Sequence, residues 1–405
     1  MQPSLGWTLL SRDALRRAET QIRDEIEGVR DEIGFLSLHQ AYADRFFPGT
    51  SVLHTRLRYA LFVPWMYERI ARQPDRQRIP AAIEKQELEL TRRLKDANES
   101  GVIGIRNYPN PTAQPPSMTY WSALGTWRIL RPTPDGTFPS RQTVNRAIAR
   151  KPARQQLHDD DRQLLIEEEP LFYSVPEPPR AWKEPTQRLD FQLESSERTF
   201  LRNCFLAVAR PASDEVPSLL ARLVEQRVEM TDRLELWSSK VRAVADQADR
   251  EALIRARRAA ALSAVGRAVY AALVEEMREK HDARPTENVH RTNLDAVVDE
   301  FAVDALALNV DDIAIDAQSI PRDILEVLKV TRSWLGSRTR DIASLFDDYE
   351  RAEARRKGRR ARLSKTLSGR DRRAEWVPDD LSKAEPLHFR WKNVRQLLMD
   401  LRETT

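Results

Sequence analysis

The sequence predicts a mainly α-helical protein, a multi-helix bundle with few short strands. Glycine is scarce, at 12 of 405 residues, and apolar residues recur at a helical spacing in many segments. Long runs rich in alanine, leucine, arginine and glutamate, all good helix formers, support the same fold class. We expect an N-terminal helical domain over residues 1–150 that holds a candidate helix-turn-helix or winged-helix-like unit. A proline-rich linker over 151–190 and a C-terminal helical bundle over 191–405, with a basic segment at 351–373, should follow.

The first predicted elements are a charged helix over residues 12–33 and a turn that launches a helix within Asp44–Arg72. A Pro-Gly pair marks the turn, and we expect Gly49 in a backbone conformation that other residues disfavour. Thr50 or Ser51 is then expected to cap the helix that follows directly.

Two arginines, Arg56 and Arg58, fall on the polar side of this helix, one to two turns from its predicted start, and Pro64 should kink or end it. A helix start attracts anions because its first N–H groups are free, and a guanidinium can bind a phosphate in a bidentate manner. Both arginines are therefore candidate nucleic-acid contacts. The alternative is a buried helix whose arginines pair with neighbouring carboxylates.

Two further helices are predicted over residues 80–99 and 118–127, the second with Ser117 as its cap. The aromatic side chains of the second helix could stack on bases. Their helical spacing favours a place in the core instead.

Residues 140–150, SRQTVNRAIAR, resemble the recognition helix of helix-turn-helix repressors. In such a helix Val144 and Ile148 pack inward, and the polar side chains face a groove of DNA. With the helix before it, this segment would complete a winged-helix-like unit. The alternative is an ordinary basic surface helix. The candidate contacts are Arg141, Gln142, Asn145 and Arg146.

The predicted linker over residues 151–190 is polar and proline-rich, which is typical of a partly extended segment. Acidic runs at 159–161 and 167–169 hold enough carboxylates for a magnesium ion. No lysine or histidine completes a nuclease pattern around them, so we interpret them as a solvated charge run and assign no metal site.

The C-terminal bundle carries an uneven distribution of charge. Residues 294–326 hold nine acidic residues and one basic residue, whereas residues 351–373 hold eleven basic residues and two acidic ones. Such positive density favours a polyphosphate chain through counterion release. The alternative is that the acidic segment neutralises the basic one. The candidate contacts are Arg355, Arg356, Lys357, Arg359, Arg360 and Arg362. The helices expected in the bundle cover residues 194–209, 216–236, 247–281, 293–306, 321–334, 337–357 and 386–402.

The sequence motifs of common catalytic sites are absent. There is no glycine-rich phosphate loop, no H-x-x-x-H, no G-x-S-x-G and no C-x-x-C. His54 is a candidate base, although a structural role fits it better. The single cysteine, Cys204, excludes an intrachain disulfide and a zinc cluster, and no signal peptide or long apolar run is present. We therefore expect a cytoplasmic protein with no catalytic residues, no cofactor, no metal and no membrane contact.

Four blocks of the sequence carry a resemblance to a known family. They are AYADRFFPGTSVLHTRLRYALFVPW from Ala41, PPSMTYWSALGTWRI from Pro115, LFYSVPEPP from Leu171 and HFRWKNVRQLLMDLR from His388. Together they resemble an uncharacterised bacterial protein family of the domain-of-unknown-function type. The chain departs from that pattern at Arg128, where the family tends to have glycine. The family has no settled activity, and the resemblance implies an association with antiphage defence genes, beside helicases and nucleases.

These observations predict a non-catalytic subunit of a bacterial antiphage defence system that binds nucleic acid, DNA in the first place. The alternative is a structural adaptor that binds a helicase or nuclease partner without contacting DNA. A third hypothesis is a nuclease-like effector whose site is assembled from distant residues. Because the net charge of +4 is too small to attract a polyanion by itself, the first hypothesis depends on the local clusters.

Overall fold

The computed structural model describes residues 33–73, 78–150, 170–213, 215–317, 319–376 and 383–402. These residues are mostly helical and form no strand, only two isolated bridges, Leu130 with Phe172 and Ala209 with Pro217. The predicted mainly α fold is confirmed. The helix expected over 12–33 and both acidic runs of the expected linker lie outside the described residues.

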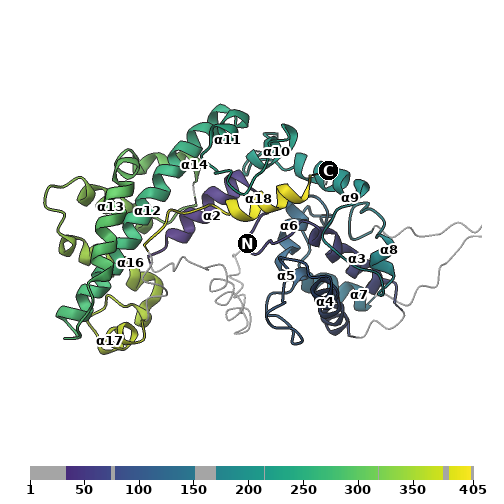
Figure 1. Cartoon of the computed structure of the whole chain (residues 1–405), viewed down its shortest axis with the longest axis horizontal. Helices are drawn as coiled ribbons and strands as arrows, with labels where there is room; N and C mark the ends of the chain where they lie inside the picture. The colour runs from purple at the N-terminus through teal and green to yellow at the C-terminus, as the bar shows by residue number, and fades with distance from the viewer. Residues whose placement is uncertain are drawn as a thin grey trace, which may run out of the picture.

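One end of the molecule is built around α3, a helix that is buried on nearly every side (Figure 1). Phe62 of α3 stacks on Trp182, and Trp65 contacts the same ring at a tilt. The indole of Trp65 donates to the Pro176 carbonyl at 2.8 Å. Described residues of the expected linker are thus packed against α3. The helices of this end are α3 (Tyr59–Ala71), α4 (Ile79–Asp96), α5 (Pro116–Thr119), α6 (Trp121–Thr126), α7 (Arg141–Arg150), α8 (Arg180–Lys183), α9 (Ser195–Leu206) and α10 (Leu219–Glu225).

The other end is organised by α12, whose alanine-rich sequence lets neighbouring helices approach closely. Gly266 shows this most clearly, because a Cβ there would lie 2.6 Å from the ring of Phe35 in α2. Overpacking of that kind is destabilising. The elements here are α11 (Ser239–Val244), α12 (Gln247–Lys280), α13 (Val289–Leu306), η1 (Val310–Asp312), α14 (Ile313–Asp316), α15 (Arg322–Leu335), η2 (Ile342–Leu345), α16 (Phe346–Lys357), η3 (Gly358–Arg360) and α17 (Leu367–Ala374).

Two helices lie between these ends, α2 (Phe35–Phe46) and α18 (Trp391–Asp400) (Figure 1). The Trp391 indole donates to the Leu234 carbonyl at 2.7 Å, and the Asn393 amide donates to the carbonyls of Val52 and His54 at 2.7 and 3.0 Å. The last described helix therefore joins segments that are far apart in the sequence. The buried apolar residues of both ends belong to one continuous core.

The turn before α3 differs from its prediction in part. Gly49 has a φ of +77°, as expected, and a Cβ there would lie 2.7 Å from the Trp127 indole nitrogen. The expected cap is wrong, because α3 begins at Tyr59 and its start has no side-chain cap. Thr50 instead donates its hydroxyl to the Phe47 carbonyl at 2.7 Å, and the Ser51 hydroxyl accepts from the Leu53 N–H. Pro64 lies inside α3 and does not end it.

The segment expected to be helix-turn-helix-like has a different geometry. Helix α7 forms with Val144 and Ile148 buried, as predicted. Residues 127–140 separate it from α6, whereas a helix-turn-helix joins its helices by a turn of about three or four residues. No described residue forms a strand that could supply a wing. Ser117, the expected cap, lies inside α5 and is buried.

Candidate nucleic-acid interface

The basic segment 351–373 is a folded unit made of the end of α16, η3 and α17, and not an open loop. Its centre is Glu353, which is fully buried. The carboxylate accepts hydrogen bonds from the Tyr270 hydroxyl at 2.6 Å, the Arg362 N–H at 2.9 Å and the Leu363 N–H at 2.8 Å. This carboxylate therefore holds the chain as it turns back after η3.

A buried ion pair fixes α17 to the end of α12. Arg373 is fully buried, and its guanidinium donates to both oxygens of Asp282 at 2.7 Å. Another of its nitrogens donates to the carbonyls of Arg362 and Ser364. The Arg373 guanidinium lowers the pKa of Asp282 to about 2, so the pair stays ionised at neutral pH.

These two anchors leave a row of arginines at the surface. Arg355 and Arg359 are exposed, and neither forms an ion pair with a described residue. Arg356 and Arg360 are exposed beside them, whereas Lys357 and Arg362 are half-buried. We call Arg355, Arg356, Arg359 and Arg360 the basic ridge.

Four carboxylates of the acidic segment 294–326 pair with cations outside the basic ridge. Its ion pairs join Asp304 to Arg257 at 2.8 Å, Asp311 to Lys329 at 2.5 Å, Asp316 to Arg255 at 2.7 Å, and Glu300 to Lys383. The alternative in which this segment neutralises the basic one therefore gains no support from these four carboxylates.

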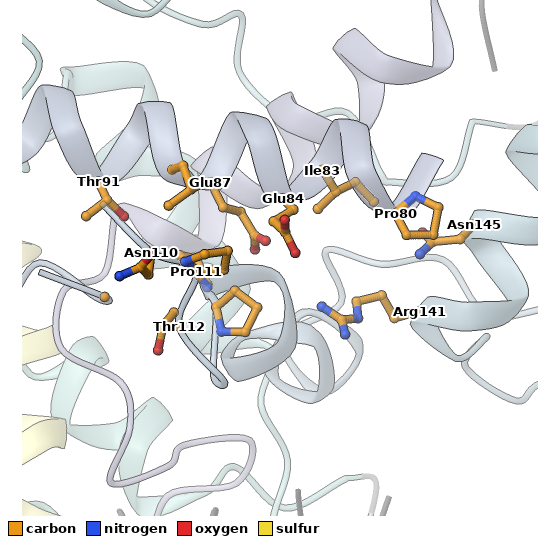
Figure 2. A pocket seen from close by; sticks show the side chains of 14 residues that line it. Pro80, Ile83, Glu84, Glu87, Thr91, Asn110, Pro111, Thr112, Arg141 and Asn145 are labelled. Atoms are coloured by element: carbon orange, nitrogen blue, oxygen red, sulfur yellow. The ribbon is translucent and has the colours of Figure 1, made fainter. Parts of the chain in front are cut away.

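The candidates on α7 are not brought together with the basic ridge, since α7 and α16 lie at opposite ends of the molecule (Figure 1). Arg141 and Asn145 line a pocket against α4, and Arg141 donates to the Ser117 hydroxyl at 2.8 Å (Figure 2). Gln142 and Arg146 are exposed. Arg141 and Asn145 therefore face the pocket, whereas Gln142 and Arg146 lie on the exposed face of α7.

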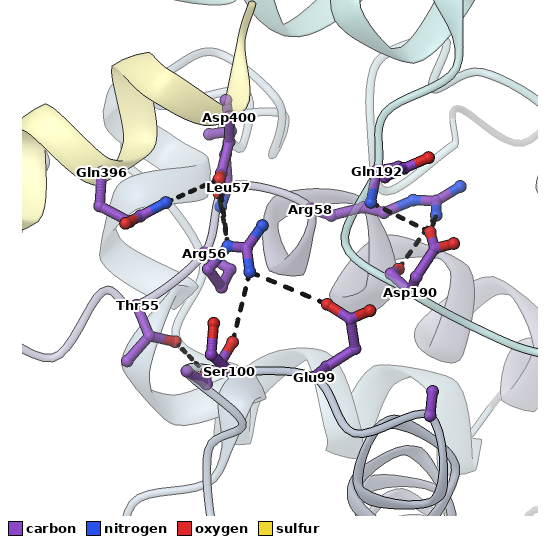
Figure 3. Close-up of polar contacts among 12 residues, drawn as sticks. Thr55, Arg56, Leu57, Arg58, Glu99, Ser100, Asp190, Gln192, Gln396 and Asp400 are labelled. Carbon is purple, nitrogen blue, oxygen red and sulfur yellow. Dashed lines mark hydrogen bonds and ion pairs between the residues drawn. The ribbon is translucent and has the colours of Figure 1, made fainter. Parts of the chain in front are cut away.

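Arg56 and Arg58 precede α3, so their expected position on its polar side is wrong (Figure 3). Arg58 is buried, and its guanidinium donates to the Glu197 carboxylate at 2.7 Å and to Asp190 at 3.0 and 3.1 Å. The Nε of half-buried Arg56 donates to both oxygens of Asp400 at 3.0 and 3.1 Å. This is the arrangement of the alternative interpretation, in which the arginines pair with carboxylates.

His54 is a structural residue in this arrangement. It is buried, stacks on Tyr120 at 4.2 Å and accepts from the Ser51 N–H through Nδ1 at 3.2 Å. Its Nε2 therefore carries the proton that it donates to the Thr119 carbonyl at 3.2 Å. Burial lowers the pKa of His54 to about 3, so the ring is neutral and both nitrogens are engaged.

Sequence reasoning missed the carboxylates that hold these arginines. Glu197 and Asp400 lie 139 and 344 residues from their arginine partners, and spacing carries no signal over such distances. Glu353 did have a signal, because it is one of only two acidic residues among eleven basic ones. An isolated carboxylate in a basic run is a reasonable candidate for an internal anchor.

Within the described ranges, no group of three histidine, cysteine, aspartate or glutamate side chains is placed to hold a metal ion. No helix in the described part of the chain is both long enough and apolar enough to span a membrane.

Comparison with known proteins gives one match. A family model described as a family of unknown function (DUF6361) matches residues 3–316. Neither a curated protein nor a solved structure matches the chain.

Proposed function

We propose that this chain, which belongs to the DUF6361 family of unknown function, is a non-catalytic nucleic-acid-binding subunit of a bacterial antiphage defence system. We place it in the cytoplasm, with DNA as the first nucleic acid to test and a helicase or nuclease as its protein partner. The basic ridge supplies the contacts, and half-buried Lys357 and Arg362 add positive charge to the same segment.

The observation that carries the proposal is the exposure of Arg355 and Arg359 without a carboxylate partner among the described residues. Cations in the last turn of α16 are also favourable toward the helix dipole. That interaction leaves the guanidinium donors of exposed Arg355 available to phosphate oxygens. Because Glu353 and Arg373 fix the backbone beneath, the ridge is presented by an ordered surface, which lowers the entropy cost of binding.

One observation favours the adaptor as a second candidate function. Leu367 begins α17 within the same basic segment, and it is 79% exposed. An exposed leucine beside arginines suits the core and rim of a protein interface. In this alternative the segment binds the helicase or nuclease partner and does not touch DNA.

The salt dependence of DNA binding tests the proposal. If the four ridge arginines each neutralise one phosphate, log affinity for a duplex should fall with log salt at a slope of about −3.6. We expect Arg355→Glu, Arg356→Glu and Arg359→Glu together to weaken binding to every sequence about equally and to flatten that slope. Fluorescence anisotropy with a labelled duplex across a salt series measures both effects.

The matched control reverses three exposed arginines elsewhere, Arg227→Glu, Arg233→Glu and Arg242→Glu, and so changes the net charge equally. We expect the control to keep the wild-type slope. A wild-type chain that fails to bind duplex or single-stranded DNA at about 50 mM salt, where phosphate contacts are strong, contradicts the proposal. Loss of a protein partner in the ridge variant would then support the adaptor.

A further inference from the structure

A pocket of about 180 Å³ lies between α4, α7 and the loop that leads into α5 (Figure 2). Its volume is below the roughly 300–1,000 Å³ of pockets for drug-sized ligands, so its occupant must be small. Pro80, Ile83, Pro111 and Pro116 give it apolar walls. Polar side chains from both helices point into the same space.

The α4 side of the pocket is lined by carboxylates. Glu87 is 7% exposed, and its Oε1 accepts from the Ser117 N–H at 2.8 Å. Glu84 lies three residues earlier on the same helix face, at the exposed rim. Burial raises the pKa of Glu87 by more than the hydrogen bonds from Ser117 and the charge of Arg141 lower it.

The α7 side supplies a guanidinium and an amide. Arg141 points across the pocket toward the two glutamates, yet it forms no ion pair with a described residue (Figure 2). Its one hydrogen bond within the described chain goes to the Ser117 hydroxyl. The Asn145 Oδ1 is buried and has no hydrogen-bond partner there. A buried acceptor without a donor carries a desolvation cost that a ligand can remove.

We propose that this pocket binds a small zwitterion of the α-amino acid class, with its ammonium group at Glu84 and Glu87 and its carboxylate on Arg141. The ammonium offers three donors, which match the two carboxylates and the free oxygen of Asn145. A guanidinium binds a carboxylate in a bidentate manner. An aliphatic side chain would lie against the proline and isoleucine walls.

The charges of the pocket argue against a phosphate-bearing occupant. Two carboxylates face one guanidinium, so an anion would meet repulsion from Glu84 and Glu87. The proposal is thus independent of the proposed nucleic-acid function, whose contacts lie at the other end of the molecule.

Thermal shift of the full chain with a panel of proteinogenic amino acids identifies the occupant, and titration calorimetry measures its affinity. Each amino acid is tested at about 10 mM, where a site with a Kd of about 1 mM is ~90% filled. We expect at least one to stabilise the chain in a saturable way. Its N-acetyl derivative lacks the ammonium and the corresponding amine lacks the carboxylate, so each should bind about tenfold or more weakly.

Two variants test the assigned contacts. Glu84→Gln and Arg141→Gln should each weaken binding about tenfold or more. Glu84 is exposed at the rim, so its replacement should leave the fold intact. The matched controls are Glu89→Gln and Arg92→Gln, which change an exposed ion pair on the same helix and should bind as wild type does. Circular dichroism checks the fold of each variant.

Proton release gives a further readout. An ammonium beside Glu87 favours its ionised form, so binding at acidic pH should release protons, and the measured enthalpy should depend on the ionisation enthalpy of the buffer. The proposal is overturned if no amino acid binds, or if Glu84→Gln and Arg141→Gln bind as wild type does. A dipeptide that binds as tightly as the free amino acid would also overturn it, in favour of a peptide amino terminus.

Discussion

Glu197 is a buried carboxylate whose ionised form depends on its partner, Arg58. Both side chains are buried, and the second oxygen of Glu197 accepts from the Glu194 N–H at 3.2 Å and so caps α9. Burial raises the pKa of Glu197, because desolvation outweighs the help from Arg58. The carboxylate therefore tolerates no further loss of partners.

Replacing Arg58 by methionine should lower the free energy of unfolding by about 3–5 kcal/mol, because Glu197 is left as an unpaired buried charge. Urea denaturation followed by circular dichroism measures the change. The control, Arg188→Met, alters an arginine whose side chain is 68% exposed and should cost about 0–1 kcal/mol. Equal stability of Arg58→Met and wild type would contradict the assigned pair. A double variant, Arg58→Met with Glu197→Leu, should recover part of the loss.

At the scale of elements, long segments with regular apolar spacing were predictable. The predicted helices at 80–99, 247–281 and 321–334 correspond to α4, α12 and α15 to within three residues at each end. The start of α3 was not predictable, because Thr50 and Ser51 form turns with their own neighbours instead of a cap. Similarly, the helix expected over 216–236 ends at Glu225, and Arg227 then adopts a φ of +48°. Local turn geometry decided both cases.

The basic segment was predictable by composition, whereas its shape was not. Counting charges identified Arg355 and Arg359 as candidates, and both are exposed. The same counting could not tell that Arg373 is fully buried on Asp282, which lies 91 residues away. Which arginines of a run reach the surface depends on tertiary contacts that the run itself does not encode.

Replacing Glu353 by leucine should destabilise the turn between α16 and α17. Three donors, the hydroxyl of Tyr270 and the N–H groups of Arg362 and Leu363, would lose a buried acceptor, each at a cost of about 1–3 kcal/mol. We expect a lower denaturation midpoint and faster hydrogen exchange at residues 362 and 363.

Asp371→Leu serves as the control for this change, because Asp371 is the other acidic residue of the segment and is exposed. It should leave the exchange rates of both amides near the wild-type values. Protection that survives in Glu353→Leu would show that the turn is held by other contacts.

At the scale of the whole molecule, buried neutral histidines couple stability to pH. Burial lowers the pKa of His39 and of His54 to about 3, from 6.5 in the unfolded chain. The unfolded state therefore binds more protons below about pH 6.5, and stability falls as the pH falls. The contribution of these neutral histidines to the free energy of unfolding is fully present above about pH 6.5 and is lost as the pH falls.

We expect the shifts of His39 and His54 alone to lower the free energy of unfolding by about 2.7 kcal/mol from pH 7.5 to pH 5.5, because each ring takes up nearly one proton on unfolding. The lowered pKa values of His290 and His388 act in the same direction. Denaturant titrations at several pH values within this window measure the slope. The window stays above the range in which most carboxylates titrate. A constant or rising stability on acidification would contradict the neutral, buried state of both rings.

The hydrogen bond from the Leu57 N–H to Asp400, at 2.7 Å, joins groups that are 343 residues apart. At a synthesis rate of about 5–20 residues per second, Asp400 is made roughly 17–70 s after Leu57. Until α18 is made, the N–H of Leu57 and the carbonyls of Val52 and His54 lack their final hydrogen-bond partners. The hydrogen bonds of the segment Asp44–Arg72 are thus among the last to be completed during translation.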